Sequence, residues 1–255
     1  MNKNPLIYWI VKINKKSGVV EKTSYLWKSQ QFFTASMIKV VFADLLYHLH
    51  KNISEQITIQ EHHKVSAWWV LHLMEHPQTI SIELAIYLMI TISDNTATNI
   101  VLEILKQYWD INLLIEKIYN KNVQVLDDHI NYTFEDFKGW GCATISEFLD
   151  TLVQILYQWP YWENIKTLMR GQFIRWRWLR YIADSTITDS GNKTWHLDTL
   201  INDCWFVEKG NDAFVYVASI ETPLHYDFEY WTENPFTKLL WATIAQEIRK
   251  IGPNI

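Results

Sequence analysis

LIYWIVKI, residues Leu6–Ile13, is a run of aromatic and β-branched side chains that is typical of a β-strand. The next five residues, NKKSG at 14–18, favour a turn, and Val19–Leu26 predicts a second strand. The chain therefore opens with a β-hairpin. Because an isolated hairpin is unstable in water, these two strands need partners from elsewhere in the chain.

Strand-like sequence returns close to the other end of the chain. Thr186–Trp195, Asp203–Val207 and Ala213–Ile220 each read as a strand, and a Gly-Asn-Asp turn joins the last two. Pro235–Ile251 then shows helical periodicity, with proline in its first turn and basic residues at its end. We expect the strands of both ends to form one antiparallel sheet, with the final helix on one face.

The middle of the chain is predicted to be helical. Apolar residues recur at spacings of three and four in Ser36–His50, Ser81–Ile92 and Thr96–Trp109. A capping box, Thr144-Ile145-Ser146-Glu147, begins a further helix that extends to about Tyr157.

This order of elements predicts an α+β fold. An antiparallel sheet of N- and C-terminal strands is flanked by helices, and the chain between them forms an all-helical insert. We expect one domain over 1–255, with an α/β subdomain of 1–30 plus 185–255 and an all-helical subdomain of 31–184.

The amino-acid composition limits the classes of partner that we expect this chain to bind. The 255 residues are 49% apolar and 20% charged, as in globular proteins, and carry a net charge of −5 with no run of like charges. This balance argues against nucleic-acid and membrane partners, and we expect a monomer. Met1–Lys16 lacks the features of an export signal, so we expect a cytoplasmic protein, or an exported one if a signal has been removed.

Ser36-Met37-Ile38-Lys39 stands at the start of a predicted helix. One turn separates Ser36 from Lys39, so the amine can reach the hydroxyl that it would deprotonate. The spacing alone is a weak signal, because Ser190 to Lys193 repeats it on a predicted strand. A serine N-cap followed by a solvated lysine explains an isolated S-x-x-K equally well.

Two other short motifs could contribute to the same cleft. Ser93-Asp94-Asn95 occupies a predicted corner between two helices, although these residue types are also common helix caps and turn formers. Lys193-Thr194 lies on a predicted strand. A lysine at a strand edge is usually solvated, so this pair matters only if it faces the cleft.

The order of the three motifs is more specific than any one of them. An S-x-x-K, an S-D-N about sixty residues later and a K-T about a hundred residues further resemble the pattern of penicillin-interacting serine enzymes. FFTASMIKV, LMITISDNTATNIVLEIL, GWGCATISEFLDTLVQIL and GNKTW…NDCWFV resemble, in order, segments of the class A β-lactamase family. The resemblance covers nearly the whole chain and implies a β-lactamase/transpeptidase-like fold.

The resemblance also implies chemical roles. Ser36 would be the nucleophile and Lys39 its base. Ser93 would pass a proton to the leaving nitrogen, and Asn95 would orient both the substrate and Lys39.

Further residues would hold the substrate. Lys193 and Thr194 would bind its carboxylate, and Arg180 is an additional candidate for the same task. The backbone amides of Ser36 and His196 would form the oxyanion hole, where fixed donors each contribute roughly 3 kcal/mol.

The sequence departs from the family pattern in two places. Trp195 replaces the glycine that follows Lys-Thr, so we expect the sheet edge or the adjacent helix to differ. The family also has a deacylating Glu with an Asn four residues later, and Val123–Phe137 offers no clear match. Asp127, four residues before Asn131, is the nearest candidate, and Glu135 has the right chemistry but lies too near the next helix.

We therefore expect a serine hydrolase that acts through an acyl-enzyme, with no metal and no cofactor. Its substrate would be a β-lactam or a related acyl-D-Ala-type amide, a small molecule or peptide carrying a carboxylate. One alternative is a penicillin-binding or DD-peptidase-like protein with slow deacylation. Another is a non-catalytic binding protein that retains the cleft.

A zinc hydrolase is a further alternative. His72-x-x-Glu75-His76 matches the inverted zinc-peptidase motif, but Pro77 follows at once and would end the helix. His62-His63 is interpreted as a pair of surface residues, since adjacent side chains on a helix do not face each other.

Overall fold

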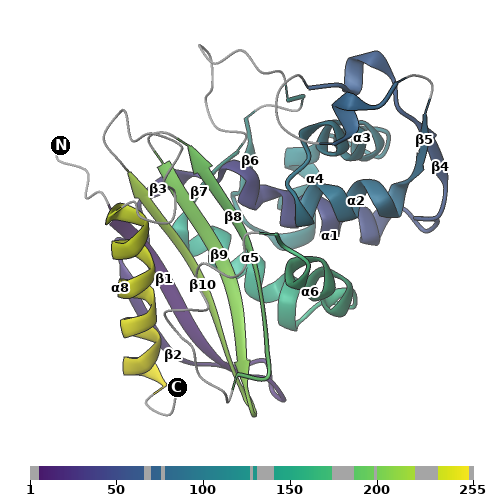
Figure 1. Cartoon of the computed structure of the whole chain (residues 1–255). Coiled ribbons are helices and arrows are strands. Elements are labelled where there is room, and N and C mark those ends of the chain that lie inside the picture. The colour runs from purple at the N-terminus through teal and green to yellow at the C-terminus, as the bar shows by residue number, and fades with distance from the viewer. Residues whose placement is uncertain are drawn as a thin grey trace.

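A sheet and a group of helices lie side by side in the computed structural model (Figure 1). The structure describes residues 6–65, 70–75, 78–126, 129–130, 141–173, 187–197, 200–221 and 235–252, with the backbone alone for 195–197. Among these residues, no helix is both long and apolar enough to cross a lipid bilayer.

The main sheet joins the two ends of the chain, as the sequence predicts. Its five antiparallel strands are β1 (Leu6–Asn14), β2 (Val20–Leu26), β8 (Asp189–Leu197), β9 (Leu200–Lys209) and β10 (Asp212–Glu221). They lie in the order β2-β1-β10-β9-β8. The strand that carries Lys193 is therefore an edge strand.

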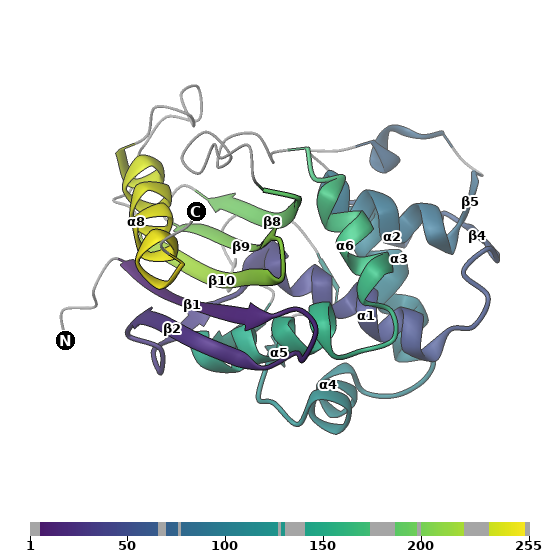
Figure 2. The same cartoon turned by 90° about the horizontal axis from the view of Figure 1, so that it is seen from below.

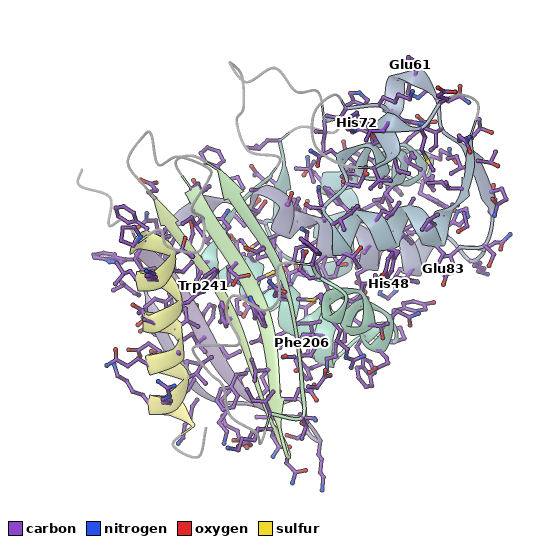
Figure 3. All side chains as sticks on the ribbon, in the orientation of Figure 1. His48, Glu61, His72, Glu83, Phe206 and Trp241 are labelled. Atoms are coloured by element: carbon purple, nitrogen blue, oxygen red, sulfur yellow. The ribbon has the colours of Figure 1, made fainter. Side chains whose placement is uncertain are left out.

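Helices cover both faces of this sheet (Figure 2). On one face, α8 (Pro235–Ile251) packs against β1 and β10 and forms a core with the inward side chains of β9 and β10. Trp241 of α8 points toward the strands (Figure 3). On the other face lies α5 (Ile145–Tyr157), which begins at the predicted capping box on Thr144. The predicted α+β fold is thus confirmed.

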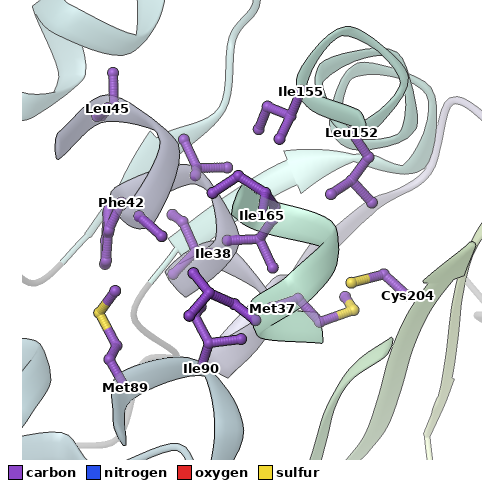
Figure 4. Close-up of a cluster of buried hydrophobic side chains, with 14 of the residues drawn as sticks. Met37, Ile38, Phe42, Leu45, Met89, Ile90, Leu152, Ile155, Ile165 and Cys204 are labelled. Carbon is purple, nitrogen blue, oxygen red and sulfur yellow. The ribbon is translucent and has the colours of Figure 1, made fainter. Parts of the chain in front are cut away.

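The remaining helices form the second part of the molecule. They are α1 (Lys39–Leu49), α2 (Ile82–Thr91), α3 (Asn95–Lys106), α4 (Ile111–Tyr119) and α6 (Trp162–Arg170). The side chains of α1 are almost all buried, because the other helices surround it. Figure 4 shows the apolar cluster between these helices and Cys204 of the sheet, which makes the two parts share one core.

Short strands interrupt the segment that is predicted to be all-helical. β3 (Gln31–Phe33), β7 (Gly141–Thr144) and β6 (Gln124–Val125) form a small sheet, and β4 (Gln56–Thr58) pairs with β5 (Thr79–Ser81). Strands of two to four residues are too short to show the alternation from which a strand is predicted.

The edge strand β8 is fastened to α6. A Cβ on Gly191 would lie 2.9 Å from the backbone nitrogen of Arg170, so only glycine allows this approach. The Arg170 guanidinium donates to both carboxylate oxygens of Asp189 at 2.9 and 2.6 Å. Lys166 donates to Glu208 of β9 at 2.6 Å. These contacts fix the strand of Lys193 against the helices.

Candidate active site

Ser36 lies in a 3₁₀ turn, η1 (Ala35–Ile38), that leads directly into α1. The turn is strained, because Ala35 adopts a φ of 46°, in the left-handed region. Ser36 is fully buried, and its Oγ has no hydrogen-bond partner among the described residues. Local strain and an unsatisfied buried hydroxyl both cost stability and are features of functional sites.

Neighbouring strands hold this turn in place. The backbone N–H of Thr34 donates to the carbonyl of Gly141 at 2.8 Å. Gly141 has no room for a side chain, since a Cβ would lie 2.4 Å from Ile38 Cδ1. From the main sheet, Asn202 Nδ2 donates to the carbonyl of Phe33 at 2.6 Å. The segment before Ser36 is thus hydrogen-bonded to the main sheet and to the small sheet that contains Gly141.

Lys39 begins α1 and is fully buried. Its Nζ donates to the carbonyl and the hydroxyl of Ser93, at 2.8 and 3.1 Å, and to Asn95 Oδ1 at 2.7 Å. Burial and the nearby positive charge of Lys193 lower the pKa of Lys39 well below its usual range, although Asp94 acts in the opposite direction. A neutral amine has two N–H groups, so on deprotonation one of the three contacts gives way to the lone pair that a general base needs.

The corner between α2 and α3 presents Ser93 and Asn95 to this amine. Ser93 has a φ of 63°, which turns the chain sharply. Asp94 caps α3 through Oδ1, and its Oδ2 accepts the backbone N–H groups of Val70 and Leu71, each at 3.1 Å. Asn95 Nδ2 is buried without a partner among the described residues, so it is a donor available to a substrate.

Lys193 brings a second amine to the same region. It is fully buried, and its Nζ donates to the carbonyl of Thr194 at 3.3 Å. Burial lowers the pKa of Lys193 to about 7, although Cys204 and Asp203 act in the opposite direction. The strand β8 that carries Lys193 packs against η1, the turn of Ser36. When Lys193 holds its proton, its charge favours an anionic ligand.

Other residues with predicted roles lie outside the described residues: Asp127, Asn131, Glu135 and Arg180. For Trp195 and His196 the structure gives the backbone of β8 alone. The deacylating base, the second oxyanion donor and the effect of Trp195 remain predictions.

The zinc-peptidase motif does not lie on the helix that its spacing requires. His72 belongs to a short 3₁₀ turn, η3 (Leu71–Leu73), and the chain becomes extended at Met74 with φ −71° and ψ 130°. His76 lies outside the described residues. The described chain therefore leaves helical geometry at Met74, within the motif.

Asn99, one turn after Asn95 on α3, is a residue that the sequence analysis missed. Its Nδ2 donates to the carbonyl of Ile130 at 3.0 Å, and the N–H of Ile130 donates to its Oδ1 at 2.7 Å. The side chain of Ile130 is buried. The sequence shows an asparagine at position 99, but its contact with Ile130 depends on tertiary structure and follows from no local pattern.

Asn202 and Gly141 were also missed as positioning residues. Both lie in segments that resemble the class A family, NDCWFV and GWGCATISEFL, but nothing in their spacing indicates contact with the turn of Ser36.

Comparison with known proteins agrees with this geometry. The sequence profile of the β-lactamase enzyme family matches residues 20–250. Among solved structures, a β-lactamase from Sphaerobacter thermophilus is 17% identical with a TM-score of 0.74, over 97% of this chain and 92% of that one. PBP-A is 19% identical with a TM-score of 0.73, over 98% and 92%. No curated protein sequence matched.

The family match spans most of the chain, and the solved structures share its fold. The chain therefore belongs to the β-lactamase enzyme family and is a serine hydrolase of the β-lactamase type.

Proposed function

We propose that Ser36 acylates itself with a β-lactam or an acyl-D-Ala-type amide. The Oγ–carbon bond forms as the hydroxyl proton passes to Lys39 Nζ. The carbon–nitrogen bond breaks as Ser93 delivers its hydroxyl proton to the leaving nitrogen and takes up the proton that Lys39 received. The observation that carries this proposal is the bond of 3.1 Å from Lys39 Nζ to Ser93 Oγ, made by an amine with a lowered pKa. Proton transfer by positioned groups accelerates reactions typically 10²–10⁴-fold.

The substrate is proposed to carry a carboxylate. Lys193 and Thr194 would bind that group, with Arg180 as a further donor, and Asn95 Nδ2 would bind the substrate's amide. The N–H groups of Ser36 and His196 would stabilise the oxyanion. β8 is an edge strand, with no further described strand paired to its outer side.

One similar structure supports acylation by a penicillin, and another supports the binding of a small molecule. A variant of PBP-A is described as an acyl-enzyme complex with penicillin G, at 19% identity and a TM-score of 0.70. L2 is described as a complex with relebactam, at 14% identity and a TM-score of 0.72.

Intact-mass spectrometry with benzylpenicillin tests the proposal. The unmodified protein should gain the mass of one penicillin, and Ser36→Ala should gain none. Because Ser36 Oγ has no hydrogen-bond partner among the described residues, this variant should melt within a few degrees of the parent. Ser190→Ala, which alters the other S-x-x-K, is the matched control and should still be labelled. An adduct on Ser36→Ala would refute the proposal.

A second candidate function is a penicillin-binding protein with slow deacylation. Asn99 fixes the backbone of Ile130 against α3, and the buried, apolar side chain of Ile130 cannot serve as a base. Asp94, the carboxylate that acts on Lys39, uses its oxygens to hold backbone N–H groups. We keep Asp127 as the proposed base for hydrolysis.

Separate rates of adduct formation and decay distinguish the two functions. If Asp127 activates water, Asp127→Asn should trap the acyl-enzyme without slowing its formation, and Glu135→Gln should decay like the parent. A decay half-life of hours in the unmodified protein would instead establish the penicillin-binding function. Fast decay in both variants would show that neither acid is the base.

A further inference from the structure

His62, His63 and Glu103 form a compact cluster that the catalytic chemistry does not use. The two histidines belong to a 3₁₀ turn, η2 (Glu61–His63), and Glu103 lies on α3. Nε2 of His62 and Nε2 of His63 lie 2.7 and 2.8 Å from the same oxygen, Oε2 of Glu103. Figure 3 labels Glu61, which places η2 at the end of the helical part far from the main sheet.

This arrangement corrects the interpretation of His62-His63 as two surface residues. In η2 the ring centroids are only 4.3 Å apart, and His63 is 1% exposed. Both rings turn toward the same oxygen of Glu103, and this shared contact brings the two adjacent side chains together. The α-helical geometry assumed for this pair is therefore wrong.

We propose that these three side chains bind one Zn²⁺ ion through His62 Nε2, His63 Nε2 and Glu103 Oε2, with water as the fourth ligand. Two imidazoles and one carboxylate are an established ligand set for zinc. Metal–ligand distances of about 2.0–2.1 Å in a tetrahedron place two ligand atoms about 3.3 Å apart. The three atoms already lie within 4.8 Å of one another, so small shifts suffice.

The cluster combines a fixed ligand with two adjustable ones. His63 is held by its own backbone, since Asn99 Nδ2 donates to its carbonyl at 3.1 Å. Beyond it, the N–H of Val65 donates to Thr96 Oγ1 at 3.1 Å. The side chains of His62 and Glu103 are 58% and 43% exposed, so they can adjust and an ion can reach them from solvent.

Binding requires one proton to move on each imidazole, because both Nε2 atoms donate to Glu103 Oε2. On His62 the ring proton moves from Nε2 to Nδ1, which frees the Nε2 lone pair for zinc. His63 Nδ1 accepts the backbone N–H of Gln60 at 3.0 Å, so the neutral ring carries its proton on Nε2, toward Glu103. On binding, the ring proton moves to Nδ1, Nε2 donates its lone pair to zinc, and the N–H of Gln60 turns to water. One hydrogen bond is lost and no net proton is released from His63.

The proposed ion would be structural. Glu103 is eight residues beyond Asn95 on α3, about 12 Å along the helix axis, which is too far for contact with the reacting atoms. Zinc would instead join η2 to α3. The proposal does not rest on acylation of Ser36, and its test uses no substrate.

Isothermal titration of the chelator-treated, dialysed protein with zinc chloride tests the site. The unmodified protein should bind one equivalent and unfold at a higher temperature with zinc. His62→Gln and Glu103→Gln should each weaken binding by more than the roughly 10–100-fold typical of outer-shell changes. The matched control is His50→Gln, which removes another histidine–carboxylate pair, 3.2 Å from Glu55, and should bind zinc like the parent.

A second measurement avoids dependence on variants. In NMR spectra of the unmodified protein, zinc should shift the imidazole resonances of His62 and His63 and leave those of His50 in place. The absence of saturable binding, or equal binding by His62→Gln, would overturn the proposal. Shifts confined to other histidines would do the same.

Discussion

The protonation state of Lys193 should control how the site binds anionic substrates. Burial lowers the pKa of this amine to about 7 in the free protein. A substrate carboxylate pairs with the charged form only, so bound substrate raises the pKa again. Above pH 7, each binding event must therefore include the uptake of one proton.

The size of the effect follows from the pKa. The second-order acylation rate constant for a penicillin should fall about tenfold for each pH unit above 7, or about 1.4 kcal/mol per unit. The decline should end where the pKa of Lys193 in the complex is reached. At lower pH, the rate constant should instead rise with pH, because Lys39 must lose its proton before it can act as the base.

Stopped-flow acylation between about pH 6 and pH 9 measures this profile. An amide or ester substrate without a carboxylate is the control and should show no decline above pH 7. Lys193→Arg should also lose the decline, because arginine stays charged at these pH values. A flat profile for the penicillin above pH 7, or an unchanged decline in Lys193→Arg, would refute the role assigned to Lys193.

Two further predictions concern stability. Burial raises the pKa of Asp203 to about 8, against hydrogen bonds from Tyr216, Trp205, Trp241 and Asn192. A folded pKa above the unfolded one stabilises the protein at low pH, and this contribution, up to roughly 5 kcal/mol, is lost as pH rises from about 4 to 8. Asp203→Asn should flatten the dependence of the free energy of unfolding on pH, as measured by urea unfolding. The same pH dependence in the variant and the parent would contradict this prediction. Gly141→Ala should lower the free energy of unfolding by about 1–3 kcal/mol and slow acylation, since its Cβ would displace Ile38 beside Ser36. A Gly141→Ala variant with the free energy of unfolding and the acylation rate of the parent would contradict this prediction.

Periodicity predicts the long elements of this fold well. The final helix has the predicted bounds, Pro235–Ile251, and the strands at the two ends pair in one sheet. Each of these elements is long enough to repeat its pattern and buries one face against a continuous core. Their assembly follows because unpaired strands are unstable.

Elements whose pattern depends on tertiary partners were not predicted. α6 carries Lys166 on its buried side, where the amine meets Glu208 and the ring of Tyr157, 3.8 Å from its centroid. A lysine in that place breaks the apolar pattern of a helix. The hydrogen bond from Asn202 to Phe33 likewise joins residues 169 positions apart, which no local pattern indicates.

Among the described residues, Lys39, Lys166 and Lys193 are buried, and their amines have different hydrogen-bond partners. These partners distinguish a lysine that stabilises the fold from the two that are proposed to act on a substrate. Lys166 donates to a carboxylate, and burial still lowers its pKa even though Glu208 acts in the opposite direction. Lys39 and Lys193 donate instead to uncharged oxygens of Ser93, Asn95 and Thr194. Burial makes a charge costly, and it is the largest cause that lowers the pKa of each of these two amines. In the proposed mechanism, the same cost makes Lys39 a base and prepares Lys193 for a carboxylate that the substrate supplies.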